Sequence, residues 1–324
     1  MSSQETVLPV AFETQLSEPK SLLGKAAGKV NFLQTMGKEI VSYTQIAGKF
    51  PDRSVTYNQG GHSFSRIRRG QPHTVLIEHA FSELQTSAIL THCKTNGVTV
   101  NHALSALCSA AWAKIATQSK ELPMYATSSS LPRFRTDLCD SIRMMYTAAN
   151  LRPHIPLPDD FTYWNLALTY FNIVLPSFSP ASPAVFWYRA RQAKTQTRNT
   201  LSSPFLVPRA LQMASARNAR ARGIPQALPS VEAIAPPAPS TALLGLSMVG
   251  RLDDIYKRNE YPDSVQLHSV TTASRLKPGG MLLLEHTFGN KLWLHLCWDE
   301  MGFKEGQVES FWEGLKDAVV EYLC

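Results

Sequence analysis

The sequence predicts an α/β protein in which helices pack on a mixed β-sheet. The chain has 324 residues, of which 44% are hydrophobic and 9% aromatic, so it can bury a large core. Short apolar runs typical of strands alternate with longer segments of helical periodicity. Near the C-terminal end, two apolar runs flank the turn Phe288-Gly289-Asn290-Lys291, which predicts an antiparallel hairpin. We therefore expect a layered α/β fold with a mixed sheet.

The first strand is predicted over residues 74–81. Ser82 can cap the helix that follows, and this helix should stop at Asn96-Gly97, because Gly tolerates the left-handed conformation that ends many helices. Asn101 is the predicted cap of a second helix, from His102 to about Thr117. The wide apolar stripe of this second helix predicts that it is largely buried.

The remaining elements follow from the same patterns. Further strands are predicted at residues 124–131, 144–151, 166–175, 243–249, 266–271, 281–286 and 292–298. Helices are predicted at 184–222, with a break at Ser203-Pro204, and at about 305–322. A proline-rich stretch at 223–240 predicts an internal loop. We expect residues 1–70 to be a linker or entry segment, with a basic surface loop at 63–70, and residues 71–324 to form one lobe.

Charge and composition exclude several classes of protein. The net charge of +7 is compatible with an anionic ligand, and no zinc-finger, helix-turn-helix or RNA-binding pattern points to nucleic acid. No secretory signal and no membrane-spanning run is visible, so we expect no membrane partner. The cysteines are odd in number and widely spaced, which predicts reduced thiols, no metal site and a cytoplasmic location: Cys93, Cys108, Cys139, Cys297 and Cys324.

One stretch of the chain is basic and free of acidic residues. Between Phe161 and Val231 there is no Asp or Glu, while Arg and Lys recur through the predicted helices. Such a strip attracts phosphate groups. The equally weighted alternative is an ordinary solvated helix face. The residues predicted to contact a phosphate-bearing ligand are Arg189, Arg191, Lys194 and Arg198.

Four segments, in this order, resemble one superfamily. They are Gly97–Leu104, which opens the predicted buried helix; Ala149–His154, which contains Asn-Leu-Arg-Pro; Leu246–Asp253, a strand-to-loop step; and Phe288–Glu300, the closing hairpin. Together they are similar to the chloramphenicol-acetyltransferase-like, CoA-dependent acyltransferases. That superfamily includes the condensation domains of nonribosomal peptide synthesis and the fungal alcohol O-acetyltransferases, which are the nearest in pattern. The resemblance covers most of residues 70–324.

The resemblance implies both a fold and a reaction. Members of this superfamily have two similar lobes with a channel between them, and this chain resembles the C-terminal lobe. The implied activity is transfer of an acyl group, most simply acetyl from acetyl-CoA, to a hydroxyl of a secondary metabolite such as a terpenoid. Acetyl-CoA is a co-substrate in this scheme, and no bound cofactor is implied. By the same resemblance, Asn150 and Arg152 lie nearest the channel, and His154 supports it from behind.

The sequence departs from the superfamily at its catalytic motif. A His-x-x-x-Asp motif supplies the base there, because a free alcohol is a poor nucleophile near neutral pH. Here only His295 has an aspartate four positions on, at Asp299, and both lie on a predicted strand, about 13 Å apart. If the alignment holds, the family's motif would precede residue 1. The candidate bases within the chain are His79 and His295, each of which is more often a structural strand residue.

Two expectations follow from a lobe without its motif. The first is that the chain is a truncated, non-catalytic lobe that binds a ligand or a partner. This is the alternative to an active O-acyltransferase. The second is that the face a second lobe would cover is exposed, so that a partner chain or self-association covers it.

A third histidine, His102, lies one position past the predicted Asn101 cap and is expected on the surface of its helix.

Overall fold

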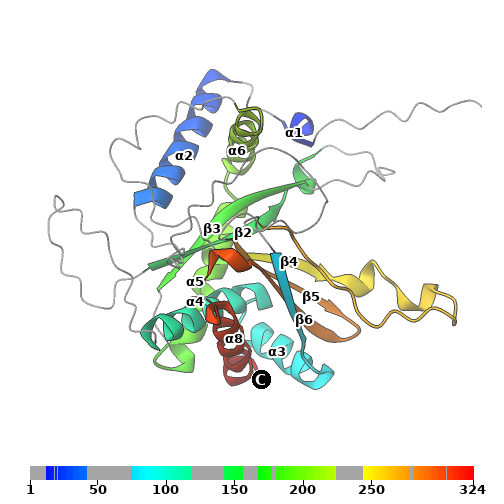
Figure 1. Ribbon diagram of the computed structural model, residues 1–324. Coiled ribbons are helices and arrows are strands. Elements are labelled where there is room, and N and C mark those ends of the chain that lie inside the picture. Colours follow the sequence, from blue (N-terminus) through cyan, green and yellow to red (C-terminus); the bar gives the residue numbers. More distant parts are fainter. Residues whose placement is uncertain are drawn as a thin grey trace, which may run out of the picture. The chain divides into compact units, whose positions relative to one another are not determined.

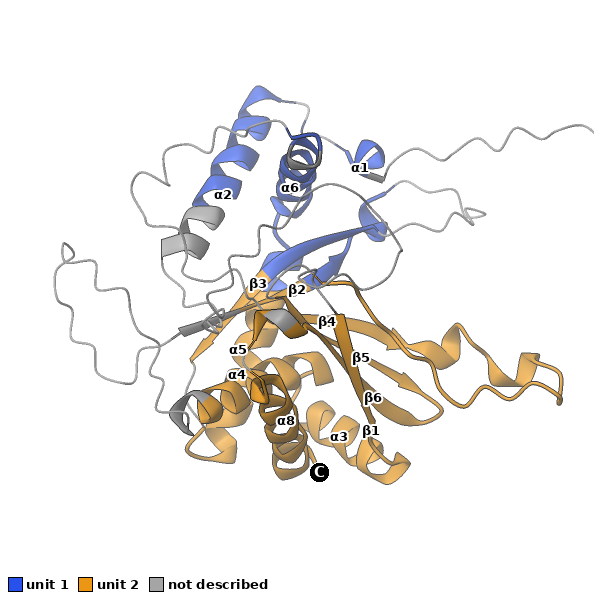
Figure 2. Ribbon diagram, in the orientation of Figure 1, with its two compact units in different colours: residues 1–42, 148–171, 198–237 blue, residues 43–147, 172–197, 238–324 orange. Residues whose placement is uncertain are grey.

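The computed structural model describes residues 12–17, 19, 21–41, 74–118, 142–155, 167–176, 180–223, 244–276, 280–303 and 305–324. The chain divides into two compact units, coloured in Figure 2. Unit 1 comprises residues 1–42, 148–171 and 198–237. Unit 2 comprises residues 43–147, 172–197 and 238–324. Each unit is built from segments far apart in the sequence.

A six-stranded mixed sheet is the main element of the fold. Its strand order is β1-β6-β5-β4-β2-β3. The strands are β1 (Thr74–Ala80), β2 (Ile142–Asn150), β3 (Leu168–Pro176), β4 (Leu244–Arg251), β5 (Met281–Phe288) and β6 (Lys291–Asp299). β6 pairs antiparallel with both β1 and β5, whereas β4 pairs parallel with both β5 and β2. The predicted α/β class with a mixed sheet is confirmed.

Three helices of unit 2 pack together over the sheet: α3 (Glu83–Thr95), α4 (Val100–Gln118) and α8 (Gln307–Leu323) (Figure 1). α3 contacts β6, and α4 contacts β4. Every residue from Asn101 to Ala113 is buried, so the prediction that this helix is largely buried is confirmed. The other helix of this region is α5 (Pro183–Leu201), where Phe186 packs against Tyr322 of α8.

The ends of α3 and α4 follow from local chemistry. Ser82 accepts from the Gln85 backbone N–H, and the Gln85 side chain accepts from that of Ser82, which forms a reciprocal capping box. The predicted Ser82 cap is therefore confirmed. The predicted Asn101 cap is wrong, because α4 begins at Val100. His102 Nδ1 instead lies 3.2 Å from the Thr99 backbone N–H, so an imidazole accepts the bond that a Glu or Gln accepts in a capping box.

The closing hairpin agrees with the prediction. Gly289 and Asn290 both have a positive φ, 61° and 60°, as a two-residue turn of this kind requires. β5 and β6 pair along their full length, from Met281 opposite Trp298 to Phe288 opposite Lys291. The final helix is also confirmed, as α8.

The strand predicted at residues 266–271 is wrong. This segment forms no strand and is held to the sheet by single contacts. The Thr271 hydroxyl donates to Glu78 of β1 at 3.2 Å, and the Leu276 backbone N–H donates to Thr74 Oγ1 at 3.0 Å. From residue 269 to residue 276, exposed and half-buried positions alternate, as they do in a segment that lies extended against a sheet.

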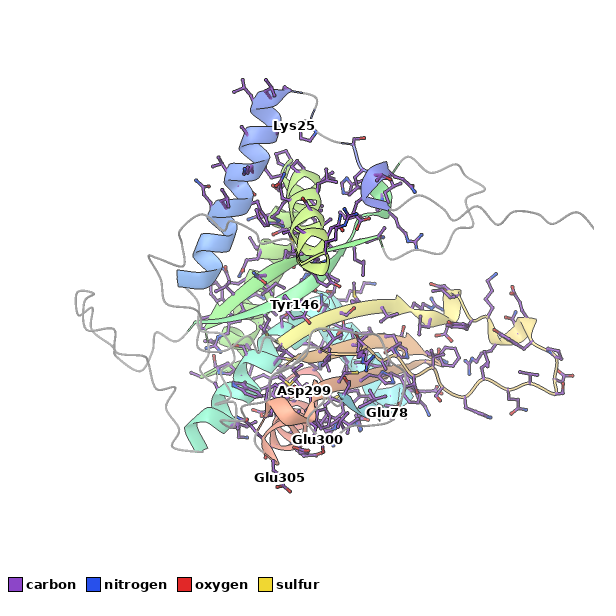
Figure 3. All side chains as sticks on the ribbon, turned by 45° about the horizontal axis from the view of Figure 1, so that its top comes forward. Lys25, Glu78, Tyr146, Asp299, Glu300 and Glu305 are labelled. Carbon is purple, nitrogen blue, oxygen red and sulfur yellow. The ribbon has the colours of Figure 1, made fainter. Side chains whose placement is uncertain are left out.

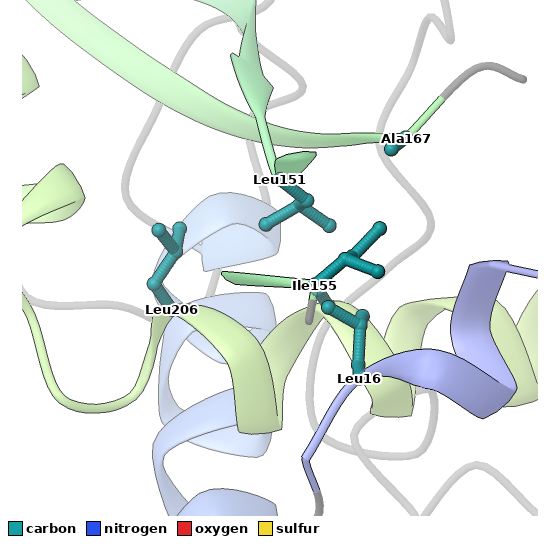
Figure 4. Close-up of a cluster of buried hydrophobic side chains, with 6 residues drawn as sticks. Leu16, Leu151, Ile155, Ala167 and Leu206 are labelled. Carbon is teal, nitrogen blue, oxygen red and sulfur yellow. The ribbon is translucent and has the colours of Figure 1, made fainter. Parts of the chain in front are cut away.

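Unit 1 contains a small core of its own. Its helices are α1 (Phe12–Gln15), α2 (Leu22–Val41) and α6 (Leu206–Ala221), and α2 packs along α6 (Figure 2). Figure 4 shows the core cluster, whose members come from three stretches of sequence: Leu16, Leu151, Ile155, Ala167, Leu206 and Ala210. α2 was not predicted, because Gly, Ala and Lys obscure its periodicity. The two predicted helices in 184–222 are confirmed as α5 and α6.

Short 3₁₀ turns complete the described chain, at Arg152–His154, Leu252–Asp254, Arg258–Glu260 and Glu300–Gly302. Several predictions lie outside the described residues: the strand at 124–131, the basic loop at 63–70, the linker boundary near 70 and nearly all of the proline-rich loop. No helix in the part of the chain that the structure describes is both long and apolar enough to cross a bilayer.

Candidate functional site

A row of polar and aromatic side chains crosses one face of the sheet. Strand register places Glu78 of β1 opposite His295 of β6, and Trp293 of β6 opposite His286 of β5. Side chains two residues apart on a strand share a face, so these four side chains lie together. The three rings stack nearly parallel: His286 lies 5.1 Å from His295 and 6.4 Å from Trp293, between ring centroids.

His295 is the centre of this cluster. Its Nε2 lies 3.2 Å from Glu78 Oε2, and its side chain is completely buried, whereas the Glu78 side chain is 46% exposed. Burial lowers the pKa of His295, and the Glu78 carboxylate acts in the opposite direction. Burial, together with the neighbouring His295, lowers the pKa of His286 to about 4. Both rings are therefore neutral at physiological pH.

A carboxylate that contacts an imidazole can orient it as a base, which is how histidine bases are commonly held. The segment 266–276 lies over this face through Thr271, and its Val270 backbone contacts His286. No exposed atom of His295 remains. An acceptor hydroxyl could reach this imidazole only if the residues that bury it moved. Asp299, the other half of the His-x-x-x-Asp match, is also fully buried, and its backbone N–H bonds to Gly280.

The Glu78–His295 contact can be tested by titration. We expect Glu78→Gln to lower the pKa of His295 further, because the substitution removes the one charge that opposes the effect of burial. Histidine ring protons followed by NMR as a function of pH would measure this shift. Glu83→Gln, an exposed position in α3, is the matched control and should leave His295 unchanged. An identical His295 titration in the Glu78 variant would contradict the contact.

His79 lies on the opposite face of β1, toward the helices. Its ring contacts Phe81 edge-on, at 4.7 Å between centroids. Burial lowers its pKa, as does Lys316 of α8, while Glu313 of α8 acts in the opposite direction. The two candidate bases, His79 and His295, are therefore on different faces of the sheet, and the structure does not bring them together.

Asn150 is the last residue of β2, and Arg152 begins the 3₁₀ turn that follows; both belong to unit 1. Asn150 Oδ1 accepts from the Arg152 backbone N–H at 3.0 Å, which forms a tight turn. Both side chains are exposed, and so is His154, while Leu151 between them is buried in the unit 1 core. The Asn-Leu-Arg-Pro segment thus fixes a turn and presents two polar side chains to solvent. Their predicted place beside a channel stays a prediction.

The basic residues predicted for phosphate binding separate into two groups. Arg191, Lys194 and Arg198 are exposed and follow one another at i, i+3 and i+7 on α5, which places them on one helix face. Lys194 Nζ also donates to the Gly97 carbonyl. Arg189 is different, because it is only 2% exposed and lies beside Tyr322 of α8. The exposed three can meet a ligand in solution, whereas Arg189 belongs to the core.

The burial of two polar residues, His102 and Glu285, was not predicted. The prediction that His102 lies on the surface is wrong: it is 7% exposed, and burial lowers its pKa to about 4. Glu285 of β5 is 3% exposed on the helix side of the sheet. Neither of its carboxyl oxygens has a hydrogen-bond partner among the described residues, and burial raises its pKa to about 8. The sequence did offer one sign of a buried carboxyl, because Glu285 directly follows the apolar run Met281–Leu284 of a predicted strand.

Metal and thiol chemistry find little support in the described residues. No group of three or more His, Cys, Asp or Glu side chains there could hold a metal ion. Burial, with the nearby Glu285 carboxyl, raises the pKa of Cys93 to about 12 and that of Cys108 as well, so these thiols are poor nucleophiles. A shallow hollow of about 520 Å³ lies between α4 and α8, beside Lys114 and Glu313. It contains no predicted site residue.

Comparison with known proteins finds similarity in structure alone. No protein-family model matches the chain, and no curated protein matches its sequence. The structure is similar to the trichothecene 15-O-acetyltransferase TRI3 from Fusarium sporotrichioides, with a TM-score of 0.64 over 96% of this chain and 56% of that one, at 11% identity.

Two further solved structures are similar over most of the chain. A condensation domain that mediates chain release from the enacyloxin polyketide synthase gives a TM-score of 0.51, at 13% identity, over 91% of this chain and 47% of that one. The PapA2 acyl transferase gives 0.50, at 12% identity, over 94% and 52%. The chain thus spans about half the length of these proteins and has the fold shared by these acyltransferases and condensation domains.

Proposed function

We propose that the protein is an O-acyltransferase that moves an acyl group, acetyl in the simplest case, from acyl-CoA to a hydroxyl of a secondary metabolite such as a terpenoid. One observation carries the proposal: the fold is that of a 15-O-acetyltransferase over 96% of this chain. Fold alone does not fix chemistry, since one fold hosts many reactions. The residues must therefore supply the reaction.

The reaction needs a base and a place for CoA. A base takes the hydroxyl proton, the oxygen attacks the thioester carbonyl, and the CoA thiolate leaves and is protonated. Within the described residues, His295 with Glu78 is a base held by a carboxylate, although a fully buried one, and His79 is half-buried. The exposed face of Arg191, Lys194 and Arg198 fits the phosphates of CoA, because charge-assisted bonds to phosphate are strong.

Turnover of acetyl-CoA by the purified 324-residue chain tests the proposal. We expect release of free CoA thiol that depends on an added alcohol, measured over a panel of terpenoid and simple alcohols. If His79 is the base, His79→Ala abolishes transfer and His295→Ala does not. If His295 is the base, the reverse holds, and Glu78→Gln also slows transfer. No transfer to any alcohol tested would overturn the enzyme proposal for this chain.

Binding of CoA is a separate test, independent of turnover. Calorimetry should show that the double variant Arg191→Ala/Arg198→Ala binds CoA about tenfold more weakly or worse. Lys257→Ala/Lys291→Ala, which removes two exposed cations that lie outside α5, is the matched control. Equal loss in both variants would mean that net charge, and not this face of α5, attracts the ligand.

The second candidate function is a lobe that binds a ligand or partner without catalysis. The burial of His295 and Asp299 favours it, since the one His-x-x-x-Asp match in the sequence offers no exposed base. The two candidates differ in a simple outcome. CoA binding that depends on Arg191 and Arg198, without any turnover, supports the binding lobe.

A further inference from the structure

An extended segment lies against the sheet face that carries Glu78 and His295. Residues 270–276, which we call the strap, belong to no strand, and exposed positions alternate in them with half-buried ones. The residues before the strap, 254–266, are all exposed. The half-buried residues of the strap are Val270, Thr272, Ser274 and Leu276. One side of the strap therefore rests on the sheet, and the other side faces solvent.

One contact joins the strap to the Glu78–His295 pair itself. Glu78, which Figure 3 labels, lies opposite His295 in the pairing of β1 with β6. The Thr271 hydroxyl donates to Glu78 Oε2 at 3.2 Å, and the same oxygen lies 3.2 Å from His295 Nε2. A hydrogen bond to a carboxylate is stronger than one between neutral groups. This bond therefore ties the strap to the charged member of the pair.

Two further contacts lie on other sides of His295. Cys297 is two residues along β6 on the same face, and the Ser274 backbone contacts its thiol. His286 of β5 stacks on His295, and the Val270 backbone contacts the His286 ring. The strap thus contacts neighbours of His295 on β1, β5 and β6. It must pass over the imidazole, whose side chain is completely buried.

The strap is held by individual bonds to sheet side chains, and none of them belongs to a backbone ladder. The remaining bond is of the same kind, since the Leu276 backbone N–H donates to Thr74 Oγ1 at 3.0 Å. A paired strand of this length would be held by a row of backbone bonds. Segments with few bonds and few buried side chains open at a lower free energy than the strands they cover. The strap can therefore open while the sheet stays intact.

We propose that the strap is a lid that opens as a unit and controls access to Glu78 and His295. In the closed position it buries the imidazole. In the open position it exposes the imidazole and releases Glu78 from Thr271, so that the carboxylate can orient the ring alone. Opening would admit an acceptor hydroxyl to His295. That consequence rests on the function proposed above, whereas the opening itself does not.

The thiol of Cys297 reports on this opening. It is fully buried on the face that the strap covers, whereas Cys93 and Cys108 are buried in α3 and α4. Labelling with N-ethylmaleimide, followed for each cysteine by mass spectrometry, should be faster at Cys297 than at the two helix cysteines, because these require the helices to unfold. Equal rates at all three would mean that this face opens only by unfolding, which overturns the lid.

Three threonine variants test which bonds hold the strap closed. Thr271→Val removes the bond to Glu78 at nearly constant volume and should speed the labelling of Cys297 at least about tenfold. Thr74→Val removes the other bond and should act in the same direction. Thr195→Val is the matched control, since Thr195 is an exposed threonine whose hydroxyl donates within α5. Labelling that neither strap variant speeds, or that the helix cysteines share, would contradict the proposal.

Access to His295 itself is measured with diethyl pyrocarbonate, which modifies neutral imidazoles. In Thr271→Val, modification of His295 should rise in step with the labelling of Cys297, while His102, buried in α4, stays unchanged. Faster modification without acyl transfer by any form of the chain would support the lid and overturn the proposed function. Acyl transfer that His295→Ala abolishes, without faster modification in Thr271→Val, would overturn the lid and support the function.

Discussion

Replacing Glu285 by Gln should stabilise the protein at neutral and alkaline pH. The carboxyl is buried, unpartnered among the described residues and held with a pKa of about 8, against an ordinary value of 4.5. The folded state therefore binds this proton more tightly than the unfolded state does. The resulting stability is complete below pH 4.5 and is lost as pH rises toward about 8. Over that window the loss amounts to a few kcal/mol.

Urea denaturation at a series of pH values measures the effect. The free energy of unfolding of Glu285→Gln minus that of the unmodified protein should be small at pH 5 and larger by a few kcal/mol at pH 9. The difference isolates this group, because other titrations cancel. Asp263→Asn, in an exposed loop, is the control and should show no such trend. Parallel pH profiles for the Glu285 variant and the unmodified protein would mean that the carboxyl finds a partner when ionised.

Substituting Gly245 by Ala should destabilise unit 2 by about 3 kcal/mol. Gly245 lies on β4 between Tyr146 of β2 and Leu282 of β5. A Cβ at this position would overlap the Tyr146 ring and lie 2.7 Å from the Leu282 side chain. Strand pairing holds the backbones of Tyr146 and Leu282 in register with Gly245, so the two side chains themselves have to shift to admit the methyl group. The Tyr146 ring fits over β4 because Gly245 has no side chain there.

A rescue experiment separates this clash from a general intolerance of substitution. In a Tyr146→Val background, the cost of Gly245→Ala should fall to about 1 kcal/mol, because the ring is gone and only the flexible end of the Leu282 side chain still has to move. Gly314→Ala on α8 is the matched control: a Cβ there meets nothing within 4 Å, so the change should stabilise the helix by up to about 1 kcal/mol. An undiminished Gly245→Ala cost in the Tyr146 background would place the strain elsewhere.

Much of the fold could be predicted from local chemistry. The Ser82 cap, the Gly97 helix end and the Gly289-Asn290 turn each follow from what a few adjacent residues can do with their backbone. In two places the local pattern fits more than one structure, and the sequence could not decide between them. The segment 266–271 contains Leu267 and Val270 and was predicted as a strand but forms none, and Asn101 could cap a helix that in fact begins at Val100.

The candidate site was only partly visible in sequence. His295 and the basic residues of α5 could be selected by residue type and spacing, and the fold resemblance could be read from four ordered segments. The sequence could not show that Arg189 and Glu285 are buried. It also could not show that Glu78 contacts His295. Burial depends on which helix covers which strand, and cross-strand contact depends on register between residues more than 200 positions apart.

By itself, the sequence determined most of the described helices and strands and the class of fold, because caps, turns and apolar periods act over a few residues. The tertiary structure decided what each element faces. It placed His79 and His295 on opposite faces of one sheet, buried the Glu285 carboxyl with no hydrogen-bond partner among the described residues, and turned the leucines of α2 outward. The physical reason is that solvation and charge are set by neighbours from distant parts of the chain, and only packing brings those neighbours together.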